Sequence, residues 1–200
     1  MQTNLTTTLT LIMLSLLLLT SLFFNFTLNS SKTKKIKELN LFKTKLDSLQ
    51  NTIYCQEEEI HQLHGIIDSL PLGPPLDTLI LSSRFGWRKR PLGSGWQMHS
   101  GVDYLAAWYD TVYCSGSGVV LNSGWNLGYG RRIKVKHILG YESTYSHLYK
   151  LFVKKGDSVK IGQPLGRAGN SGAVTGPHLH YEIIKNGKSI NPEKFILIKQ

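Results

Sequence analysis

Cysteine is nearly absent from this 200-residue chain, which has only Cys55 and Cys114. The two lie far apart in the sequence and neither belongs to a Cys-x-x-Cys pair, so we expect no disulfide within the chain. Cys114 stands in a run of small residues, where a buried side chain with no reactive role is expected. Cys55 is available to join two chains, although no other feature requires it.

Turn-forming residues are scarce in the first 77 residues, and nearly all of the 19 glycines follow them. We therefore predict one compact domain over residues 78–200. Its length is sufficient to bury a core without disulfides or a structural metal.

Acidic residues are few after the same boundary. Residues 1–77 carry 6 Lys and Arg and 7 Asp and Glu, whereas residues 78–200 carry 17 and 6, which gives net charges of −1 and +11. A domain this basic favours anionic partners such as nucleic acid, acidic phospholipid or a cell-wall polymer. We predict no nucleic-acid partner, because no zinc finger, helix-turn-helix or RNA-binding aromatic motif accompanies the charge.

Charge is missing altogether from residues 9–28, LTLIMLSLLLLTSLFFNFTL. Twenty apolar residues in a helix cross a hydrocarbon layer of ~30 Å, so residues 1–31 are expected to form a membrane anchor. A cleaved signal peptide is the alternative, but a basic leading segment and a small-x-small cleavage site are both lacking. Four lysines follow the span and none precedes it, which by the positive-inside rule places the C-terminal domain inside.

Residues 32–70 show an apolar heptad repeat. The repeat consists of Leu39, Leu46, Ile53, Ile60 and Ile67, with Phe42, Leu49, Gln56, Leu63 and Leu70 three residues further on. This pattern predicts a coiled-coil helix of roughly 48 Å that pairs with a second copy or a partner helix, with Gln56 setting the register. The alternative is a single amphipathic helix folded against its own domain. Residues 71–77, rich in Pro and Gly, are expected to end the helix and form a stiff linker.

The period of the pattern changes to two after the linker. Apolar and charged side chains alternate over residues 132–137, and a second alternation runs over residues 141–149. Short glycine-containing segments separate these stretches at close intervals. We therefore predict a mainly β domain built on an antiparallel sheet with tight connections.

Five histidines lie in the predicted domain, and the positions of three of them suggest a site. His178 and His180 project from one face of a predicted strand, with Glu182 on the same face. His99 and Asp103, four residues apart, also share a face of an extended segment. A catalytic zinc takes three protein ligands, and His99, Asp103 and one of the His178/His180 pair supply them, which leaves the other histidines for proton transfer.

These segments together resemble the lysostaphin/LytM-type zinc metallopeptidases. The matching motifs are Phe85-Gly86-Trp87-Arg88, Met98-His99-Ser100-Gly101-Val102-Asp103, Tyr145-Ser146-His147-Leu148 and Gly176-Pro177-His178-Leu179-His180-Tyr181-Glu182. They follow the order and spacing of that family over about residues 78–196. Two departures are Met98, where an aromatic residue is common, and Arg131, where a small polar one is. We expect Arg131 and Arg132 to influence substrate choice.

The resemblance implies a role for each matching residue. His99, Asp103 and His180 would bind Zn2+, and His147 and His178 would be the catalytic histidines. The family has no such role for a fifth histidine, His137, which the alternation places beside apolar side chains as a structural residue.

The resemblance also implies a function: a zinc endopeptidase that hydrolyses stem peptides or cross-links of peptidoglycan in the cell envelope. Bonds from D-Ala to diaminopimelate and glycine bridges are both cut by relatives, and the anchor-coil-peptidase order favours the former. A wall substrate requires the domain on the outer side of the membrane, against the flanking lysines. Two alternatives remain, a scaffold or regulator that binds peptidoglycan without cutting it and a domain held in the cytoplasm.

Overall fold

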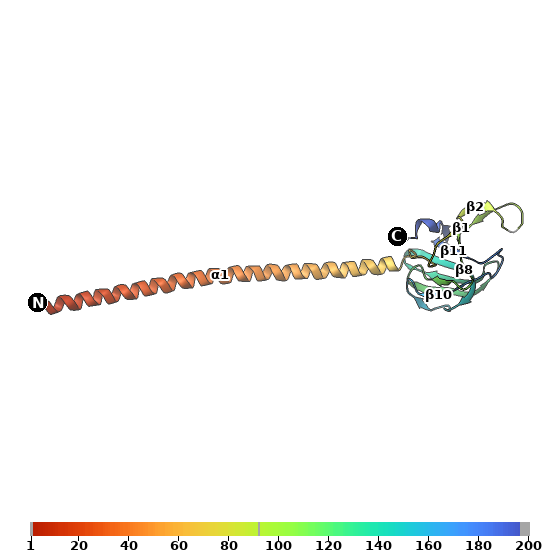
Figure 1. The fold of residues 1–200 in the computed structure, drawn as a ribbon. Coiled ribbons are helices and arrows are strands. Elements are labelled where there is room, and N and C mark those ends of the chain that lie inside the picture. Colours follow the sequence, from red (N-terminus) through yellow and green to blue (C-terminus); the bar gives the residue numbers. More distant parts are fainter. Residues whose placement is uncertain (1, 92, 197–200) are drawn as a thin grey trace. The chain divides into compact units, whose positions relative to one another are not determined.

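A long helix and a β-domain make up the described part of the protein (Figure 1). The computed structural model describes residues 2–91 and 93–196. The chain divides into two compact units between Ile60 and His61. Helix α1 covers Gln2–Asp68. The strands of the β-domain are β1 (Leu81–Ser83), β2 (Gly86–Lys89), β3 (Trp96–His99), β4 (Val102–Leu105), β5 (Thr111–Tyr113), β6 (Gly118–Asn126), β7 (Gly130–Lys136), β8 (Tyr141–Leu151), β9 (Ser158–Val159), β10 (Pro164–Ala168), β11 (His178–Lys185) and β12 (Lys188–Ile190), with 3-10 turns η1 (Ile138–Gly140) and η2 (Pro192–Lys194).

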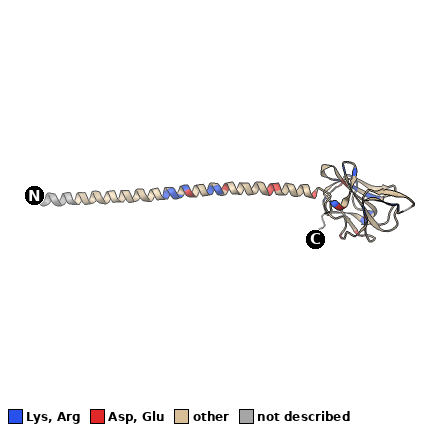
Figure 2. Ribbon diagram, turned by 90° about the horizontal axis from the view of Figure 1, so that it is seen from above, with Lys and Arg blue, Asp and Glu red and all other residues tan. Residues whose placement is uncertain are grey.

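Helix α1 is long and apolar enough in its N-terminal part to cross a membrane. Figure 2 shows this part without charged residues, and blue and red turns begin only further along the helix, from Lys32 onward. Within the apolar part, the hydroxyls of Ser15, Thr20 and Thr27 donate hydrogen bonds to the backbone carbonyls three residues earlier, at 2.8–2.9 Å. These bonds satisfy polar groups that hydrocarbon could not.

The heptad residues of α1 are exposed in the single chain. Leu39 and Phe42 are each 67% exposed, and Ile53, Ile60 and Leu63 about half. A row of large apolar side chains in solvent is the arrangement that a partner helix would cover. The coiled coil stays a prediction, as do the domain boundaries drawn from the sequence.

Residues 71–77 form no regular element, and they pack onto the β-domain. The Gly73 amide donates to the carbonyl of Ser115 at 2.7 Å, and the Tyr113 amide donates to the carbonyl of Pro75 at 2.9 Å. Leu76 is only 3% exposed and belongs to the core. This segment therefore contributes to the folded unit as well as ending the helix.

The β-domain is an antiparallel structure, which confirms the predicted fold class. Its main sheet runs β1-β4-β11-β8-β7-β6-β9, with β10 paired to both β5 and β8 and with β12 paired to β11. Strands β2 and β3 form a separate hairpin. The central strands β11 and β8 alternate, so that one face of each contributes to the core and the other carries polar side chains.

The core contains a chain of polar groups among its apolar side chains. Tyr145 and Tyr181 are fully buried, and both phenol groups hydrogen-bond to the hydroxyl of Ser115 at 2.8 Å. Burial raises the pKa of both phenols. Burial also raises the pKa of the Cys114 thiol to about 11, so this cysteine is the inert core residue that the sequence predicts.

His137 lies in the same buried region and is 4% exposed. Its Nδ1 donates to the carbonyl of Ser117 at 3.0 Å, and its Nε2 lies 2.8 Å from the hydroxyl of Ser143. It holds the end of β7 against its neighbours, in agreement with the structural role expected from the sequence. Burial lowers its pKa, because the charged imidazolium loses solvation.

We expect the His137→Gln variant to be less sensitive to acid than the wild type. The folded pKa of His137 lies below the unfolded value of about 6.5, so the unfolded chain binds more protons as the pH falls through that value. One such group costs stability by up to about 1.4 kcal/mol per pH unit below pH ~6.5, and the substitution removes this cost. Urea unfolding followed by tryptophan fluorescence from pH 7.5 to 5 measures the slope. His64→Gln, at an exposed position of α1, is the control, and equal slopes for all three proteins would contradict the assignment.

Candidate metal centre and groove

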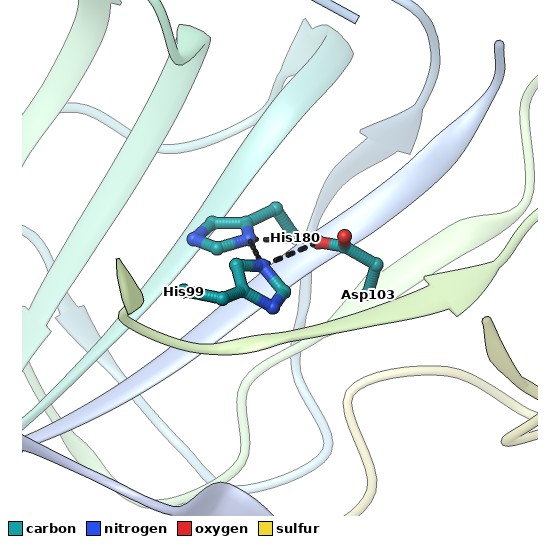
Figure 3. Close-up of side chains that lie close together, drawn as sticks. All are labelled: His99, Asp103 and His180. Atoms are coloured by element: carbon teal, nitrogen blue, oxygen red, sulfur yellow. Dashed lines mark hydrogen bonds and ion pairs between the residues drawn. The ribbon is translucent and has the colours of Figure 1, made fainter. Parts of the chain in front are cut away.

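Three predicted ligands converge from three strands (Figure 3). His99 ends β3, Asp103 is in β4, and His180 is in β11, directly opposite Asp103 in the pairing of the two strands. The Nε2 of His99 lies 3.1 Å from Asp103 Oδ1 and 3.0 Å from His180 Nδ1, and His180 Nδ1 lies 2.8 Å from Asp103 Oδ1. All three residues are at least 94% buried. Together they form a cluster able to hold a metal ion.

The approach of β3 and β4 to β11 depends on Gly101. A Cβ at this position would lie 2.2 Å from the carbonyl oxygen of Tyr181 and 2.8 Å from Cγ of Glu182. Only glycine lets the backbone between His99 and Asp103 come this close.

The outer atom of each ligand is also held. Nδ1 of His99 donates to the carbonyl of Arg84 at 2.8 Å, and Nε2 of His180 donates to Glu182 Oε1 at 3.2 Å. Arg88 pairs with Asp103 Oδ2 at 3.2 Å. With these assignments, the lone pairs of the inner nitrogens and of Oδ1 all point into the cluster.

The donor set fits zinc. Zinc accepts imidazole nitrogen and carboxylate oxygen at ~2.0–2.2 Å, and at tetrahedral angles such ligand atoms are about 3.3 Å apart. The observed separations of 2.8–3.1 Å are a few tenths of an ångström shorter. Three protein ligands leave one position of a tetrahedron free, as in catalytic rather than structural sites.

The surroundings of the cluster keep both of its carboxyl groups ionised. Burial would raise the pKa of Asp103, but hydrogen bonds with His180 and His99 bring it far below its usual range. Burial would also raise the pKa of Glu182, yet His180, Arg132 and Ser100 lower it to about 2. The two carboxylates outweigh the effect of burial on His180 and raise its pKa. Both carboxyl groups are therefore ionised beside the ligand nitrogens.

His147 reaches the cluster through a β-bulge. The pairing of β8 with β7 shifts between Tyr145 and Leu148, and the φ of His147 is +66°. Strict alternation would put His147 on the core face with Tyr145. The bulge turns it to the other face, where its ring centroid lies 4.8 Å from His178 and 5.9 Å from His180. Bulges commonly redirect a side chain in this way beside functional sites.

His147 and His178 present the same ring atom to the cluster. Nδ1 of His147 donates to the carbonyl of Ser171, and Nδ1 of His178 to that of Gly176, each at 2.8 Å. Nε2 is then the acceptor atom of each ring, and that of His178 lies 3.8 Å from Asp103 Oδ1. Burial lowers the pKa of His147 to about 4, which leaves the ring neutral at neutral pH.

A groove of about 650 Å3 opens over these side chains. Its walls are the β2–β3 hairpin, the turn at residues 128–129 and the loop at residues 173–177. Gly130, next to the turn, packs closely against Ser171, which precedes the loop. The φ of Gly130 is +65°, and a Cβ there would lie 2.3 Å from the Ser171 hydroxyl. The Ser171 hydroxyl accepts a hydrogen bond from the Arg131 amide at 2.9 Å. The backbone carbonyl of Ser171 accepts one from Nδ1 of His147. The groove wall and the histidine are thus fixed by one residue.

Arg132 differs from the expectation drawn from its sequence position. Its side chain is 15% exposed, forms an ion pair with Glu182, and lies 4.3 Å from the centroid of the Tyr129 ring. The charge of Arg132 is paired inside the domain, whereas Arg131 is exposed. Sequence reasoning did not assign roles to Glu182, Ser171 or Tyr129. Only Glu182 gave a signal, through its position on the same strand face as His180.

Comparisons with known proteins agree with this geometry. Residues 97–192 match the family model described as peptidase family M23. The crystallised catalytic domain of lysostaphin from Staphylococcus simulans is 33% identical, and the match covers 58% of this chain and 91% of that domain with a TM-score of 0.53. The chain belongs to peptidase family M23. The resemblance noted from the motifs is thereby confirmed.

Other M23 relatives are longer than this chain. The DD-carboxypeptidase/endopeptidase Mpg of Neisseria meningitidis serogroup B is 39% identical over 118 residues, which are 59% of this chain and 27% of Mpg. The peptidoglycan DD-endopeptidase ShyC of Vibrio cholerae is 40% identical over 122 residues, or 60% of this chain and 28% of ShyC. A zinc-containing peptidase from Vibrio cholerae is 33% identical, with a TM-score of 0.56 over 58% of this chain and 37% of its own. The similarity covers the M23 domain.

We expect Gly101→Ala to separate the ligands of this M23 domain. The added methyl group must displace either β11 or the His99–Asp103 turn, at a cost of roughly 1–3 kcal/mol in unfolding free energy. Zinc binding should weaken as well, because the ligands come from the two segments that are forced apart. Gly124→Ala is the control, since nothing lies within 4 Å of a Cβ there. Urea unfolding and zinc titration measure both effects, and identical results for the two variants would contradict the close-approach argument.

Proposed function

We propose that this protein is a zinc-dependent endopeptidase that hydrolyses peptide bonds in peptidoglycan. One arrangement supports the proposal above all. His99, Asp103 and His180 direct three ligand atoms at one point, and the rings of His147 and His178 lie beside it in the lining of a groove. A metal ion and proton-transfer groups side by side at a groove are what hydrolysis of an extended peptide requires.

His99, Asp103 and His180 would hold the zinc ion through Nε2, Oδ1 and Nδ1 respectively. When bound, zinc supplies a Lewis acid that polarises a carbonyl group and makes water more acidic. Arg88 keeps the second oxygen of Asp103 occupied, so that the carboxylate offers one oxygen to the centre.

His147 and His178 would carry the proton transfers. Each ring is held by a hydrogen bond from Nδ1 to a backbone carbonyl, so Nε2 is the atom that can accept a proton from the attacking water. The resulting imidazolium can stabilise negative charge on the carbonyl oxygen and then donate its proton to the leaving amine. The ring centroids are 4.8 Å apart, so both histidines can act on one substrate molecule.

We favour a DD cross-link of peptidoglycan as the substrate bond. The relative ShyC is named a peptidoglycan DD-endopeptidase and Mpg a DD-carboxypeptidase/endopeptidase, and the sequence order of anchor, coil and peptidase points the same way. The net charge of +11 over residues 78–200 suits an anionic wall polymer.

The N-terminal helix would anchor the enzyme beside its substrate. We propose a single membrane span within the apolar part of α1, with the M23 domain on the outer side in the cell envelope. The heptad row would recruit a second copy or a partner helix there.

The ligand and proton-transfer roles predict different losses. His180→Ala removes a ligand and should abolish both zinc retention and activity, whereas His147→Ala should keep zinc and lose activity by about 10²-fold or more. The purified full-length protein in detergent is incubated with defined cross-linked muropeptides. Mass analysis of the products measures activity, and elemental analysis of the protein measures bound zinc. His64→Ala, exposed on α1, should behave as the wild type. A wild-type protein that binds no zinc and cuts no cross-link would instead favour a wall-binding scaffold.

The proposed topology predicts that the M23 domain is exposed on the outer face of the membrane. Protease added to intact spheroplasts should degrade the domain while a cytoplasmic marker protein survives. Protection of the domain until the membrane is permeabilised would place it in the cytoplasm, as the four lysines after the span indicate by charge alone.

A further inference from the structure

Glu182 is a buried carboxylate immediately behind the metal cluster. It is 3% exposed and lies two residues after His180 on β11, so both side chains project from the same face. Its Oε1 accepts a hydrogen bond from Nε2 of His180 at 3.2 Å. Burial of a charged group is costly unless the charge is paired and hydrogen-bonded, so this position calls for a specific compensating structure.

Four donors from four segments surround this carboxylate. The Ser100 hydroxyl, between β3 and β4, donates to Oε1. Thr144 of β8 donates to Oε2 at 2.8 Å, and Arg132 of β7 forms an ion pair with the same oxygen. With His180, these donors fix the position of both oxygens.

Arg132 is itself held in place. Its guanidinium group lies 4.3 Å from the centroid of the Tyr129 ring and donates to the Thr144 hydroxyl at 3.1 Å. The Tyr129 ring centroid in turn lies 5.6 Å from that of His180. The carboxylate, the guanidinium and the ring therefore enclose the outer side of His180.

We propose that Glu182 is a positioning residue that sets the tautomer of His180 and strengthens it as a metal ligand. Because Glu182 accepts a hydrogen bond from Nε2 of His180, the ring keeps its hydrogen on that nitrogen. The lone pair of Nδ1 then faces His99 and Asp103. A carboxylate in this place also makes the imidazole a better electron donor than a neutral acceptor does. His99, by contrast, donates to the neutral carbonyl of Arg84.

The consequence is an unequal pair of imidazole ligands. Without Glu182, His180 can place its proton on either nitrogen, and only one of the two tautomers presents a lone pair to the centre. Loss of the carboxylate therefore weakens metal binding without removing a ligand. This inference rests on the proposed zinc centre.

Zinc affinity of the full-length protein in detergent tests the proposal. The probe is Zn2+ in competition with a chromophoric chelator, and the variants are Glu182→Gln and Glu182→Leu. We expect the zinc dissociation constant to rise on the order of 10–100-fold for Glu182→Leu and by less for Glu182→Gln, whose amide oxygen can still accept from Nε2. Glu142→Gln is the matched control, because Glu142 also pairs with a cation, Lys134 at 2.8 Å, but lies away from the cluster. It should bind zinc as the wild type does.

The tautomer gives a second readout that does not depend on activity or on metal. Imidazole 15N and 1H shifts of the metal-free protein, labelled on histidine, should report a hydrogen on Nε2 of His180 in the wild type. In Glu182→Leu they should report loss of that hydrogen in favour of Nδ1, which lies 2.8 Å from Asp103 Oδ1. Should Glu182→Leu fail to fold by circular dichroism, the near-isosteric Glu182→Gln decides. Unchanged zinc affinity in folded Glu182→Gln and Glu182→Leu, or an unchanged tautomer, overturns the proposal. A wild type that binds no zinc overturns the proposed function instead.

Discussion

The convergence of three lone-pair atoms in a space with little solvent is the constraint on which the rest of the site depends. Two imidazole nitrogens and a carboxylate oxygen lie within 3.1 Å of one another, at residues that are at least 94% buried. Such atoms repel each other unless a proton or a cation lies between them. The fold therefore has to hold them in place from behind. A backbone carbonyl, an arginine and a glutamate do so, one behind each ligand.

Strand pairing brings the ligands together, and two local departures from regular structure complete the site. His180 and Asp103 face each other in the β11–β4 ladder, which fixes two ligands with no loop between them. Gly101 lets the chain turn back from β3 into β4 against β11, and this turn brings in His99. The bulge at His147 adds the fourth side chain from the opposite side. Rigid strands thus carry the three proposed ligands, while the strained position carries a histidine outside that set.

The sequence predicts the parts of this site that depend on local pattern. The alternation of β11 places His178, His180 and Glu182 on one face, and the structure brings all three to the cluster. His99 and Asp103 also meet, at 3.1 Å, but they do so across the turn between β3 and β4 and not along one face of an extended segment. The antiparallel sheet and the family follow from the same motifs. Period-two reasoning fails at His147, because parity assigns it to the face of Tyr145 and no residue type in the segment signals a bulge.

Contacts across the sheet explain why other features could not be read from the sequence. Arg132 looked like a groove residue because it follows a glycine turn, but its direction is decided by Glu182 and Thr144 on neighbouring strands. The packing of residues 71–77 on the domain depends on Ser115 and Tyr113, about forty residues away. Burial of a short Pro-rich segment is set by its partners, and its composition does not name them.

The charges around the cluster are balanced before any metal is added. Asp103 pairs with Arg88, and Glu182 pairs with Arg132, so the two carboxylates do not leave a net negative site. A divalent cation held there would therefore keep most of its excess charge, and that charge is what polarises a carbonyl group. The same two arginines lower the cost of burying the carboxylates. With a cation bound, the arrangement would combine a stable, buried donor set with a strongly electrophilic centre, in the lining of a groove of a domain that is basic overall.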